Sequence, residues 1–350
     1  MIKSPMVFSC RAVCVLIALL VLAPSCRAIS EENYATTYKT AVLPFLNSGQ
    51  RFNFPSADGK YALSGIRFLH PHAKGMIVVV NGFSQSWLQY GELFYDLYHQ
   101  GYSVISYDHR GQGLSPHLVP FNSQIGYVRD FSEYSDDLDA FMEHVVKPLH
   151  PGARGLFLIA HSMGAAVATE YLELHSASPP FEAAVFCAPM YQITTAPYPE
   201  WLAQTTVGTA HLLGLGQHYA IGKHDYDPKE PFKSNKVTQS FARWQQNQQT
   251  KTKYPEIVIG GPSNEWVNTS LSKTRRIRSK EAAITVSTLL LEAGKDQLVG
   301  SQAESQAGAM IPHSRLILFP ESQHEILMEK DTIRDKALSE IERFFADKEH

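Results

Sequence analysis

Residues Gly155–Ala165 read Gly-Leu-Phe-Leu-Ile-Ala-His-Ser-Met-Gly-Ala, and this stretch decides how the chain folds. Its first half is a continuous apolar run, which is typical of a strand buried on both faces. Its second half places Ser162 between small residues, directly before the helical pattern of Ala165–Leu174. Strand, tight turn and helix around a serine indicate a nucleophile elbow, in which Ala160 replaces the first glycine of G-x-S-x-G. We therefore predict that Ser162 is a nucleophile; the alternative is a structural serine that caps the helix.

Short apolar runs of the same kind recur along the chain, with helical patterns between them. The other runs are Met76–Val80, Tyr102–Tyr107, Ala183–Cys187, Thr288–Glu292 and Arg315–Phe319. The helical patterns cover Trp87–Tyr98, Phe131–Val146 and Ile333–Phe345. This alternation predicts a mostly parallel, doubly wound α/β sheet. Combined with the nucleophile elbow, it predicts the α/β-hydrolase fold.

The alternation stops over residues 189–282, a segment too long for a structureless loop in a compact domain. We predict that this segment is an inserted, mainly helical cap over the carboxyl edge of the sheet, where ligands bind in open α/β sheets. Residues 29–188 and 283–350 are then the two parts of the hydrolase core. The cap is rich in aromatic side chains, namely Tyr191, Tyr198, Trp201, Tyr219, Tyr226, Phe232, Trp244, Tyr254 and Trp266.

A serine hydroxyl needs a histidine to take its proton and an acid to orient that histidine. In this fold the chain order is serine, acid, histidine. Asp296 lies in the turn just past the apolar run Thr288–Glu292, and His324 lies in the loop past Phe319. We predict that Asp296 is the catalytic acid and His324 the general base.

Other acids and histidines fit these roles less well. Asp108 and His109 also follow a strand, but they precede the nucleophile, which is the wrong order. We expect their loop, Asp-His-Arg-Gly-Gln-Gly-Leu-Ser, to be structural, with Asp108 and Arg110 hydrogen-bonded to each other. Glu292 lies within its strand rather than after it, and the geometry of the turn points His161 away from the nucleophile.

The tetrahedral intermediate of acyl transfer needs backbone N–H donors. One donor is expected at Met163, the residue after the nucleophile, and the other in the loop after the Met76–Val80 strand. That loop reads Asn-Gly-Phe-Ser, and Gly82 permits an unusual backbone there. Phe83 is therefore the predicted second oxyanion donor; an ordinary turn is the alternative.

The composition excludes several classes of function. A formal net charge of −3 gives no global basic surface for nucleic acid. The 15 histidines show no metal-ligand spacing, and the chain has no dinucleotide or phosphate-binding loop. We expect no metal, no cofactor and no nucleic-acid partner.

The N-terminus resembles an export signal. Basic residues precede the apolar run Ala12–Ala23, which is shorter than the ~20 residues of a membrane-spanning helix. We predict a signal peptide over residues 1–28, cleaved after Ala28, and a periplasmic or secreted protein. The alternatives are a lipoprotein acylated at Cys26 and an uncleaved membrane anchor. Three of the four cysteines lie in this segment, which leaves Cys187 as a buried, unpaired thiol.

Several motifs resemble those of a known family. The chain from about Ala41 onward is similar to the bacterial lysophospholipase L2 family, in the monoacylglycerol-lipase-like branch of the α/β-hydrolases. The branch motifs are Asp108–Ser115, His161–Gly164, Ala293–Val299 and His324–Leu327, and the cap motifs are Asn235–Arg243 and Ile259–Val267. The resemblance implies catalytic roles for Ser162, Asp296 and His324, with Phe83 and Met163 as oxyanion donors. Asn81 departs from the histidine that many relatives carry.

The resemblance implies a serine carboxylic-ester hydrolase that releases a fatty acid from lysophospholipids through an acyl-enzyme on Ser162. A monoacylglycerol lipase or esterase, a lysophospholipid acyltransferase, a peptide hydrolase and an inert binding module are the alternatives. Aromatic cap residues are expected to line an acyl groove. The basic run Lys273–Lys280 is either a solvated helical face or a site for a phosphate head group, and contact with a membrane surface fits such a substrate.

Overall fold

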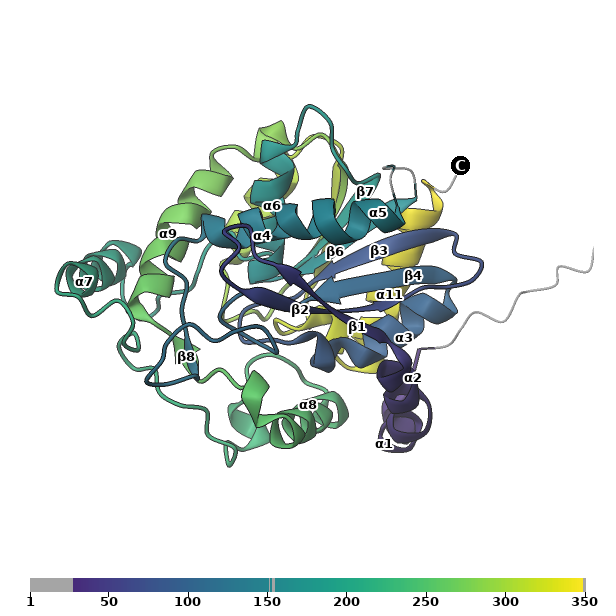
Figure 1. The fold of residues 1–350 in the computed structure, drawn as a ribbon, viewed down its shortest axis with the longest axis horizontal. Coiled ribbons are helices and arrows are strands. Elements are labelled where there is room, and N and C mark those ends of the chain that lie inside the picture. Colours follow the sequence, from purple (N-terminus) through teal and green to yellow (C-terminus); the bar gives the residue numbers. More distant parts are fainter. Residues whose placement is uncertain (1–27, 151, 153–154, 349–350) are drawn as a thin grey trace, which may run out of the picture.

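The central feature of the protein is an eight-stranded sheet (Figure 1). The computed structural model describes residues 28–150, 152 and 155–348. The strand order is β1-β2-β4-β3-β6-β7-β9-β10, and every pairing from β4 to β10 is parallel. The strands are β1 Gln50–Pro55, β2 Ala62–Phe68, β3 Gly75–Val80, β4 Tyr102–Tyr107, β6 Leu156–His161, β7 Ala183–Cys187, β9 Ser287–Ala293 and β10 Ser314–Phe319. All six apolar runs are strands, and the predicted α/β-hydrolase fold is confirmed.

Helices cover both faces of this sheet. The α-helices are α1 Tyr34–Thr37, α2 Leu43–Ser48, α3 Gly91–His99, α4 Ser132–Phe141, α5 Lys147–Leu149, α6 Met163–Leu174, α7 Glu200–Leu212, α8 Phe241–Lys253, α9 Asn264–Arg278, α10 Ser301–Met310 and α11 Asp331–Ala346. Short 3₁₀ segments are η1 Glu31–Asn33, η3 Trp87–Tyr90, η5 Phe232–Ser234, η6 Pro255–Ile257, η7 Glu281–Ala283 and η8 Ile326–Met328, and two π segments are η2 Tyr38–Val42 and η4 Met142–Val146. The predicted helix over Phe131–Val146 is thus split between α4 and η4.

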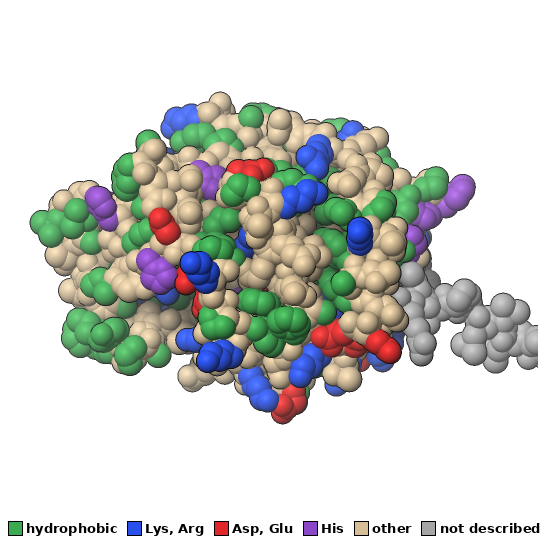
Figure 2. All heavy atoms as spheres, turned by 90° about the horizontal axis from the view of Figure 1, so that it is seen from below, with side chains coloured by type: hydrophobic (Ala, Val, Ile, Leu, Met, Phe, Trp, Pro, Cys, Tyr) green, Lys and Arg blue, Asp and Glu red, His purple; other side chains and the backbone are tan. Residues whose placement is uncertain are grey.

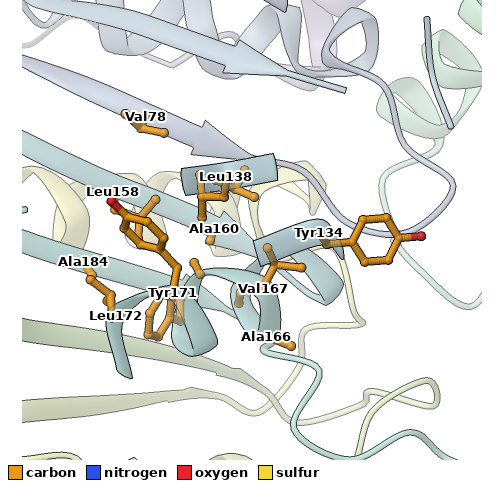
Figure 3. Close-up of a cluster of buried hydrophobic side chains, with 14 of the residues drawn as sticks. Val78, Tyr134, Leu138, Leu158, Ala160, Ala166, Val167, Tyr171, Leu172 and Ala184 are labelled. Carbon is orange, nitrogen blue, oxygen red and sulfur yellow. The ribbon is translucent and has the colours of Figure 1, made fainter. Parts of the chain in front are cut away.

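The two faces of the central strands build two separate cores. In β3 and β6, Val78 and Leu158 face α4 and α6, in the cluster that Figure 3 shows. The alternate residues Ile77 and Phe157 belong to a second cluster, with α3 and α11. Because successive side chains of a strand point to opposite faces, a strand covered on both sides must be apolar throughout.

The strands β1 and β2 have no counterpart in the predicted set. They form an antiparallel hairpin at the edge of the sheet, and β2 pairs antiparallel with β4. Much of β1 is exposed, and Phe54 is its one fully buried residue. Such a half-exposed edge strand lacks the continuous apolar run that marks the central strands.

Between β7 and β9 the chain leaves the sheet and forms the three cap helices, of which α7 and α9 lie at the left and α8 at the bottom of Figure 1. A two-residue strand β8, Gly261–Pro262, pairs with β5, Ile125–Gly126, and so joins the cap to the loop that precedes α4. The cap also buries side chains against the core, since Trp266 of α9 packs on the ring of Phe83 with 4.3 Å between centroids.

The predicted signal segment, residues 1–28, lies outside the described residues except for Ala28. Within the described part of the chain, no helix combines the length and the apolar character that crossing a membrane requires. Cys187, at the end of β7, is buried and unpaired, as expected.

Candidate active site

Ser162 occupies the turn between β6 and α6 with a backbone that side-chain-bearing residues rarely adopt, φ 52° and ψ −118°. The Ser162 N–H donates to the carbonyl of Cys187 at 3.0 Å, and the N–H of Met190 donates to the Ser162 carbonyl at 3.0 Å. These bonds attach the turn to the end of β7. Gly164 allows α6 to start close to β3, since a Cβ on it would lie 2.4 Å from the carbonyl oxygen of Asn81.

The structure brings the three predicted triad residues into one hydrogen-bonded chain. His324 Nε2 lies 2.8 Å from Ser162 Oγ, and His324 Nδ1 lies 2.6 Å from Asp296 Oδ2. Asp296 follows β9 by three residues and His324 follows β10 by five, so both loops reach the carboxyl edge of the sheet beside Ser162. The other carboxylate oxygen of Asp296 accepts the N–H groups of Leu298 and Val299, at 2.7 and 3.1 Å, which fixes the carboxylate plane.

The environment of the triad sets the pKa values of His324 and Asp296 in the directions that proton transfer from Ser162 requires. Burial by itself lowers the pKa of His324, but its hydrogen bond to Asp296 and the charge of that carboxylate outweigh burial and raise the pKa above 6.5. Burial opposes ionisation of Asp296, yet the bonds from His324 and from two backbone amides hold its pKa below the usual value. His324 is therefore a stronger base than a free imidazole, beside an ionised acid.

Met163 directly follows Ser162, and the loop that carries Phe83 approaches it, since a Cβ on Gly82 would lie 3.2 Å from the Cβ of Ser162. Met163 begins α6, and its N–H has no acceptor within the described residues. In the loop after β3, Gly82 donates its N–H to Gln85 Oε1 at 2.7 Å and Ser84 donates to Gln112 Oε1 at 3.2 Å. Among the described residues, the Phe83 N–H between them has no acceptor. Two free amides beside a serine hydroxyl are what an oxyanion requires.

The prediction that Asp108 and Arg110 are hydrogen-bonded to each other is wrong. Arg110 instead forms a two-bond ion pair with Asp137 of α4, at 2.6 Å for each bond. The carboxylate of Asp108 accepts four hydrogen bonds, among them one from the side chain of Asn81 at 2.9 Å and one from the Leu114 N–H at 2.8 Å. Residues two apart in an irregular loop point to different sides, so proximity in sequence did not identify the partner. These hydrogen bonds and the ion pair hold the loop in place within the core.

The rejected rivals lie near the site in other roles. His161 packs its ring against that of His324, with 4.8 Å between centroids, and its Nε2 lies 3.3 Å from the His324 carbonyl oxygen. Burial lowers the pKa of His161 to about 3, so this ring is neutral. His109 Nε2 contacts the carbonyl of Asn81, and Glu292 accepts a bond from Ser305.

Sequence reasoning missed Gln85, which lies in the loop that carries Phe83, and Gln112, which contacts that loop. Gln85 connects Gly82, Tyr90 and, through its Nε2, the carboxylate of Glu325 at 2.6 Å. Glutamine side chains that support a loop show no characteristic sequence spacing. The one feature of the sequence that could have indicated a role for Gln112 is its position inside the loop of residues 108–115.

The cap does not present the basic run Lys273–Lys280 as one solvated or free cationic face. Lys273 is buried and pairs with Glu170 of α6 at 2.5 Å, and Arg275 pairs with Glu200 of α7 at 2.9 Å. Arg278 donates to the carbonyl of Tyr191. Three of the five basic side chains therefore attach α9 to its neighbours α6 and α7 and to the segment after β7, whereas Arg275, Arg276 and Lys280 are exposed to solvent.

No group of three or more histidine, cysteine, aspartate or glutamate side chains in residues 28–150, 152 and 155–348 is placed to hold a metal ion. A cavity of about 320 Å³ opens where β3, β4 and β6 begin, and Lys74, Ser103 and Glu182 are among its lining residues. It lies at the amino edge of the sheet, opposite to Ser162.

Comparison with known proteins agrees with this geometry. Residues 71–331 match the family described as serine aminopeptidase, S33. The lysophospholipase L2 of Escherichia coli K12 is 32% identical over 288 residues, which cover 80% of this chain and 83% of that protein. A probable lysophospholipase L2 of Haemophilus influenzae is 32% identical over 270 residues, which cover 77% and 83%.

Solved structures share the fold at low sequence identity. A thermostable carboxyl esterase of Bacillus coagulans is 18% identical with a TM-score of 0.69, over 86% of this chain and 99% of that one. A monoglyceride lipase of Saccharomyces cerevisiae is 15% identical with a TM-score of 0.65, over 86% and 96%. The chain is a serine hydrolase that belongs to the serine aminopeptidase S33 family of the α/β-hydrolase fold, with lysophospholipase L2 proteins among its relatives.

Proposed function

We propose that this protein is a lysophospholipase, which releases the fatty acid of a single-chain lipid through an acyl-enzyme on Ser162. The observation that carries the proposal is the buried Ser162–His324–Asp296 chain beside the free amides of Phe83 and Met163. The lipid substrate class is supported by the names of the relatives that share 32% identity.

The mechanism has two acyl-transfer steps. His324 Nε2 takes the Ser162 proton while Oγ attacks the ester carbonyl, and the N–H groups of Phe83 and Met163 stabilise the oxyanion. The carbon–oxygen bond to the alcohol then breaks, and the alcohol leaves with the proton from His324. In the second step His324 takes a proton from water, the hydroxide attacks the acyl-enzyme, and Ser162 regains its proton as the fatty acid leaves.

A lipid aggregate is the proposed docking partner of the cap. The helix α7 and the loop after it expose large apolar side chains, with Trp201 68% and Leu212 84% exposed. Figure 2 shows hydrophobic side chains gathered at the end of the molecule that carries α7. Exposed apolar patches of this kind are typical of membrane or partner contact.

We also propose that the protein is exported, because an apolar segment resembling a signal peptide lies at its N-terminus. Intact-mass analysis of the purified protein would detect cleavage after Ala28.

The test is to measure fatty-acid release from lysophosphatidylcholine, monoacylglycerol and diacyl phospholipid in parallel, with Ser162→Ala as the control. The proposal predicts the highest kcat/KM on the lysophospholipid and no activity of the variant. Preference for monoacylglycerol would support a monoacylglycerol lipase instead. Transfer of the acyl group to added glycerol, measured in the same assay, would identify an acyltransferase. An amino-acid p-nitroanilide tests the peptidase activity that the family description names.

A further inference from the structure

The loop after β4, residues 108–115, is buried and takes no part in the proposed acyl transfer, yet it lies against the loop that carries Phe83. Within it, Gln112 is 1% exposed. Its Oε1 accepts the Ser84 N–H at 3.2 Å, and its Nε2 donates to the Gly82 carbonyl at 2.7 Å. One side-chain amide therefore binds the residues on both sides of Phe83. Nε2 also lies 3.0 Å from the carbonyl of Gln85, its second acceptor in that loop.

The Phe83 loop needs such support because its backbone is strained. Ser84 has φ 60°, a left-handed conformation that residues other than glycine adopt at a cost of about 1–3 kcal/mol. The loop belongs to no helix or strand that would hold it. Strained conformations persist only when surrounding contacts determine them. The contacts here come from Gln112 on one side and from Gln85, which accepts the Gly82 N–H at 2.7 Å.

These bonds leave the amide of Phe83 available. With the Gly82 N–H, the Gly82 carbonyl and the Ser84 N–H all engaged, the peptide planes on either side of Phe83 are fixed. The Phe83 N–H is then directed by its neighbours and spends no hydrogen bond on the protein within the described residues. An oxyanion donor is effective when it is aimed before the charge develops.

We propose that Gln112 is a positioning residue for the oxyanion hole, which acts through Phe83 and does not touch the substrate. The inference rests on the proposed acyl transfer at Ser162. A glutamine is required because the same group must accept from Ser84 and donate to Gly82. Glutamate accepts but cannot donate, and its charge opposes the developing oxyanion; alanine does neither.

The experiment compares Gln112→Ala and Gln112→Glu with the wild type on p-nitrophenyl butyrate. Loss of one oxyanion donor costs about 10²–10³ in kcat, so we expect a fall of at least about tenfold in kcat with KM changed by less than about threefold. Affinity for an alkyl boronic acid, which mimics the tetrahedral intermediate, falls by the same factor as kcat/KM. Affinity for a fatty alcohol, which carries neither a charge nor a tetrahedral centre, stays unchanged.

Ser115→Ala is the matched control in the same loop. Ser115 Oγ donates to the Asp108 carbonyl at 2.6 Å and accepts the Ser64 N–H at 2.9 Å, so it attaches the loop to β2 and does not contact the Phe83 loop. This variant is expected to lose stability and to keep kcat within about twofold of the wild type. If both Gln112 variants also keep kcat and boronate affinity, or if Ser115→Ala loses as much, the proposal is overturned.

The two proposals fail in different ways. A Ser162→Ala variant that remains active, or a wild type that cleaves no ester, contradicts the proposed function. In that case the rate at which a fluorophosphonate labels Ser162 still tests Gln112, because phosphonylation also develops an anionic oxygen. Slower labelling of both Gln112 variants, with Ser115→Ala unchanged, supports the positioning role; equal rates overturn it.

Discussion

At the scale of single residues, Ser162 and Gly164 show how the nucleophile elbow depends on close backbone approach. Ser162 holds a strained conformation, and Gly164 lies where α6 meets the end of β3. A Cβ at Gly164 would lie 2.4 and 2.5 Å from the carbonyl oxygens of Asn81 and Val80, both backbone atoms that cannot rotate away. The elbow therefore tolerates alanine at position 160 but not at 164.

Gly164→Ala is expected to lower the free energy of unfolding by about 1–3 kcal/mol, the usual range for overpacking, and to reduce kcat because Met163 moves. Guanidinium unfolding and steady-state kinetics measure the two effects. Gly208→Ala is the control, since a Cβ at this position of α7 would meet only Asn268 at 3.9 Å. It is expected to stabilise by about 0.4–1 kcal/mol. Equal stability of the two variants would contradict this account of the elbow.

The ionisation of His324 predicts the pH profile. Its pKa is raised above 6.5, chiefly by Asp296 against the effect of burial, and only the neutral ring accepts the Ser162 proton. We expect kcat/KM to fall as the pH decreases through an apparent pKa above 6.5. In Asp296→Asn the inflection moves to lower pH, and the rate falls by about 10⁴ because the tautomer is no longer held. A wild-type inflection below 6.5 would contradict the role of Asp296.

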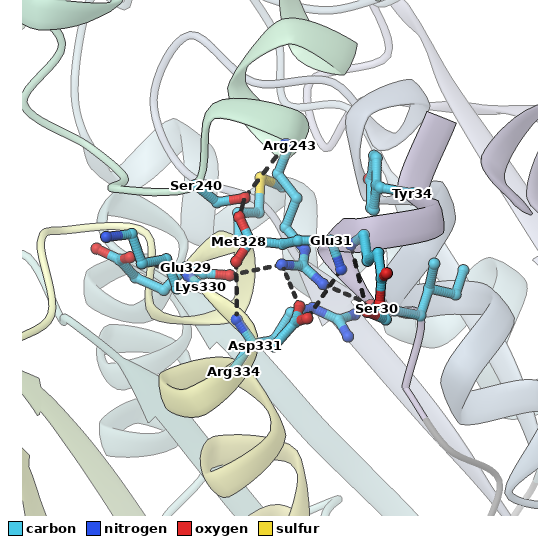
Figure 4. A network of polar contacts seen from close by, with 12 residues as sticks. Ser30, Glu31, Tyr34, Ser240, Arg243, Met328, Glu329, Lys330, Asp331 and Arg334 are labelled. Atoms are coloured by element: carbon cyan, nitrogen blue, oxygen red, sulfur yellow. Dashed lines mark hydrogen bonds and ion pairs between the residues drawn. The ribbon is translucent and has the colours of Figure 1, made fainter. Parts of the chain in front are cut away.

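At the scale of elements, the cap helix α8 is attached to the core by a buried charge network (Figure 4). Arg243 of α8 pairs with Glu92 of α3 at 3.0 Å and with Asp331 at the start of α11 at 2.9 Å. It also donates to the carbonyls of Ile29 and Glu329. One guanidinium thereby joins the cap, both parts of the core and the N-terminal segment.

Arg243→Met is expected to destabilise the protein by up to about 3 kcal/mol, since the buried Glu92 loses this partner and keeps Arg334, at 3.2 Å. Urea unfolding monitored by circular dichroism measures the change. Arg343→Met removes an exposed arginine from Glu340, which keeps Arg315 as a partner at 2.9 Å, and is expected to cost less than about 1 kcal/mol. If both variants lose a similar free energy of unfolding, burial of the charge network does not determine how much the network contributes to stability.

At the scale of the whole molecule, the apolar residues of α7 and the loop after it form a surface separate from both hydrophobic cores. Leu212, Leu213 and Trp201 are exposed there, whereas α9 beneath them is held to α6 by Lys273 and Glu170. The cap thus has one side fixed to the core and one side that exposes apolar residues, which is the side proposed to dock on lipid.

The triple variant Trp201→Ser, Leu212→Ser, Leu213→Ser is expected to bind phosphatidylglycerol vesicles at least about tenfold more weakly, because apolar burial supplies about 25 cal/mol per Å². Vesicle sedimentation gives the binding, and kcat/KM on p-nitrophenyl butyrate is expected to stay within about twofold of the wild type. Leu174→Ser, at an exposed position that ends α6, is the control and should bind as the wild type does. Unchanged binding of the triple variant would contradict the docking proposal.

The sequence predicted more of the sheet than of the contacts between loops. Each central strand is apolar along its whole length because helices cover both of its faces, so a local pattern reports it. The edge strand β1 is half exposed and left no such run. Arg110 binds Asp137, 27 positions away along the chain, and Lys273 binds Glu170, 103 positions away. A local sequence pattern cannot identify partners that are so far apart in the sequence.

By itself, the sequence determined the class of fold, the order of the central strands along the chain and the positions of Ser162, Asp296 and His324 after strands. These follow from periodicity and from chain order, which are local properties. Only the tertiary structure decided that His324 lies 2.8 Å from Ser162, that Gln112 holds both neighbours of Phe83 and that Lys273 of the basic run is buried against Glu170. Those outcomes depend on how separate loops meet at one edge of the sheet, and that meeting is set by the packing of the whole chain.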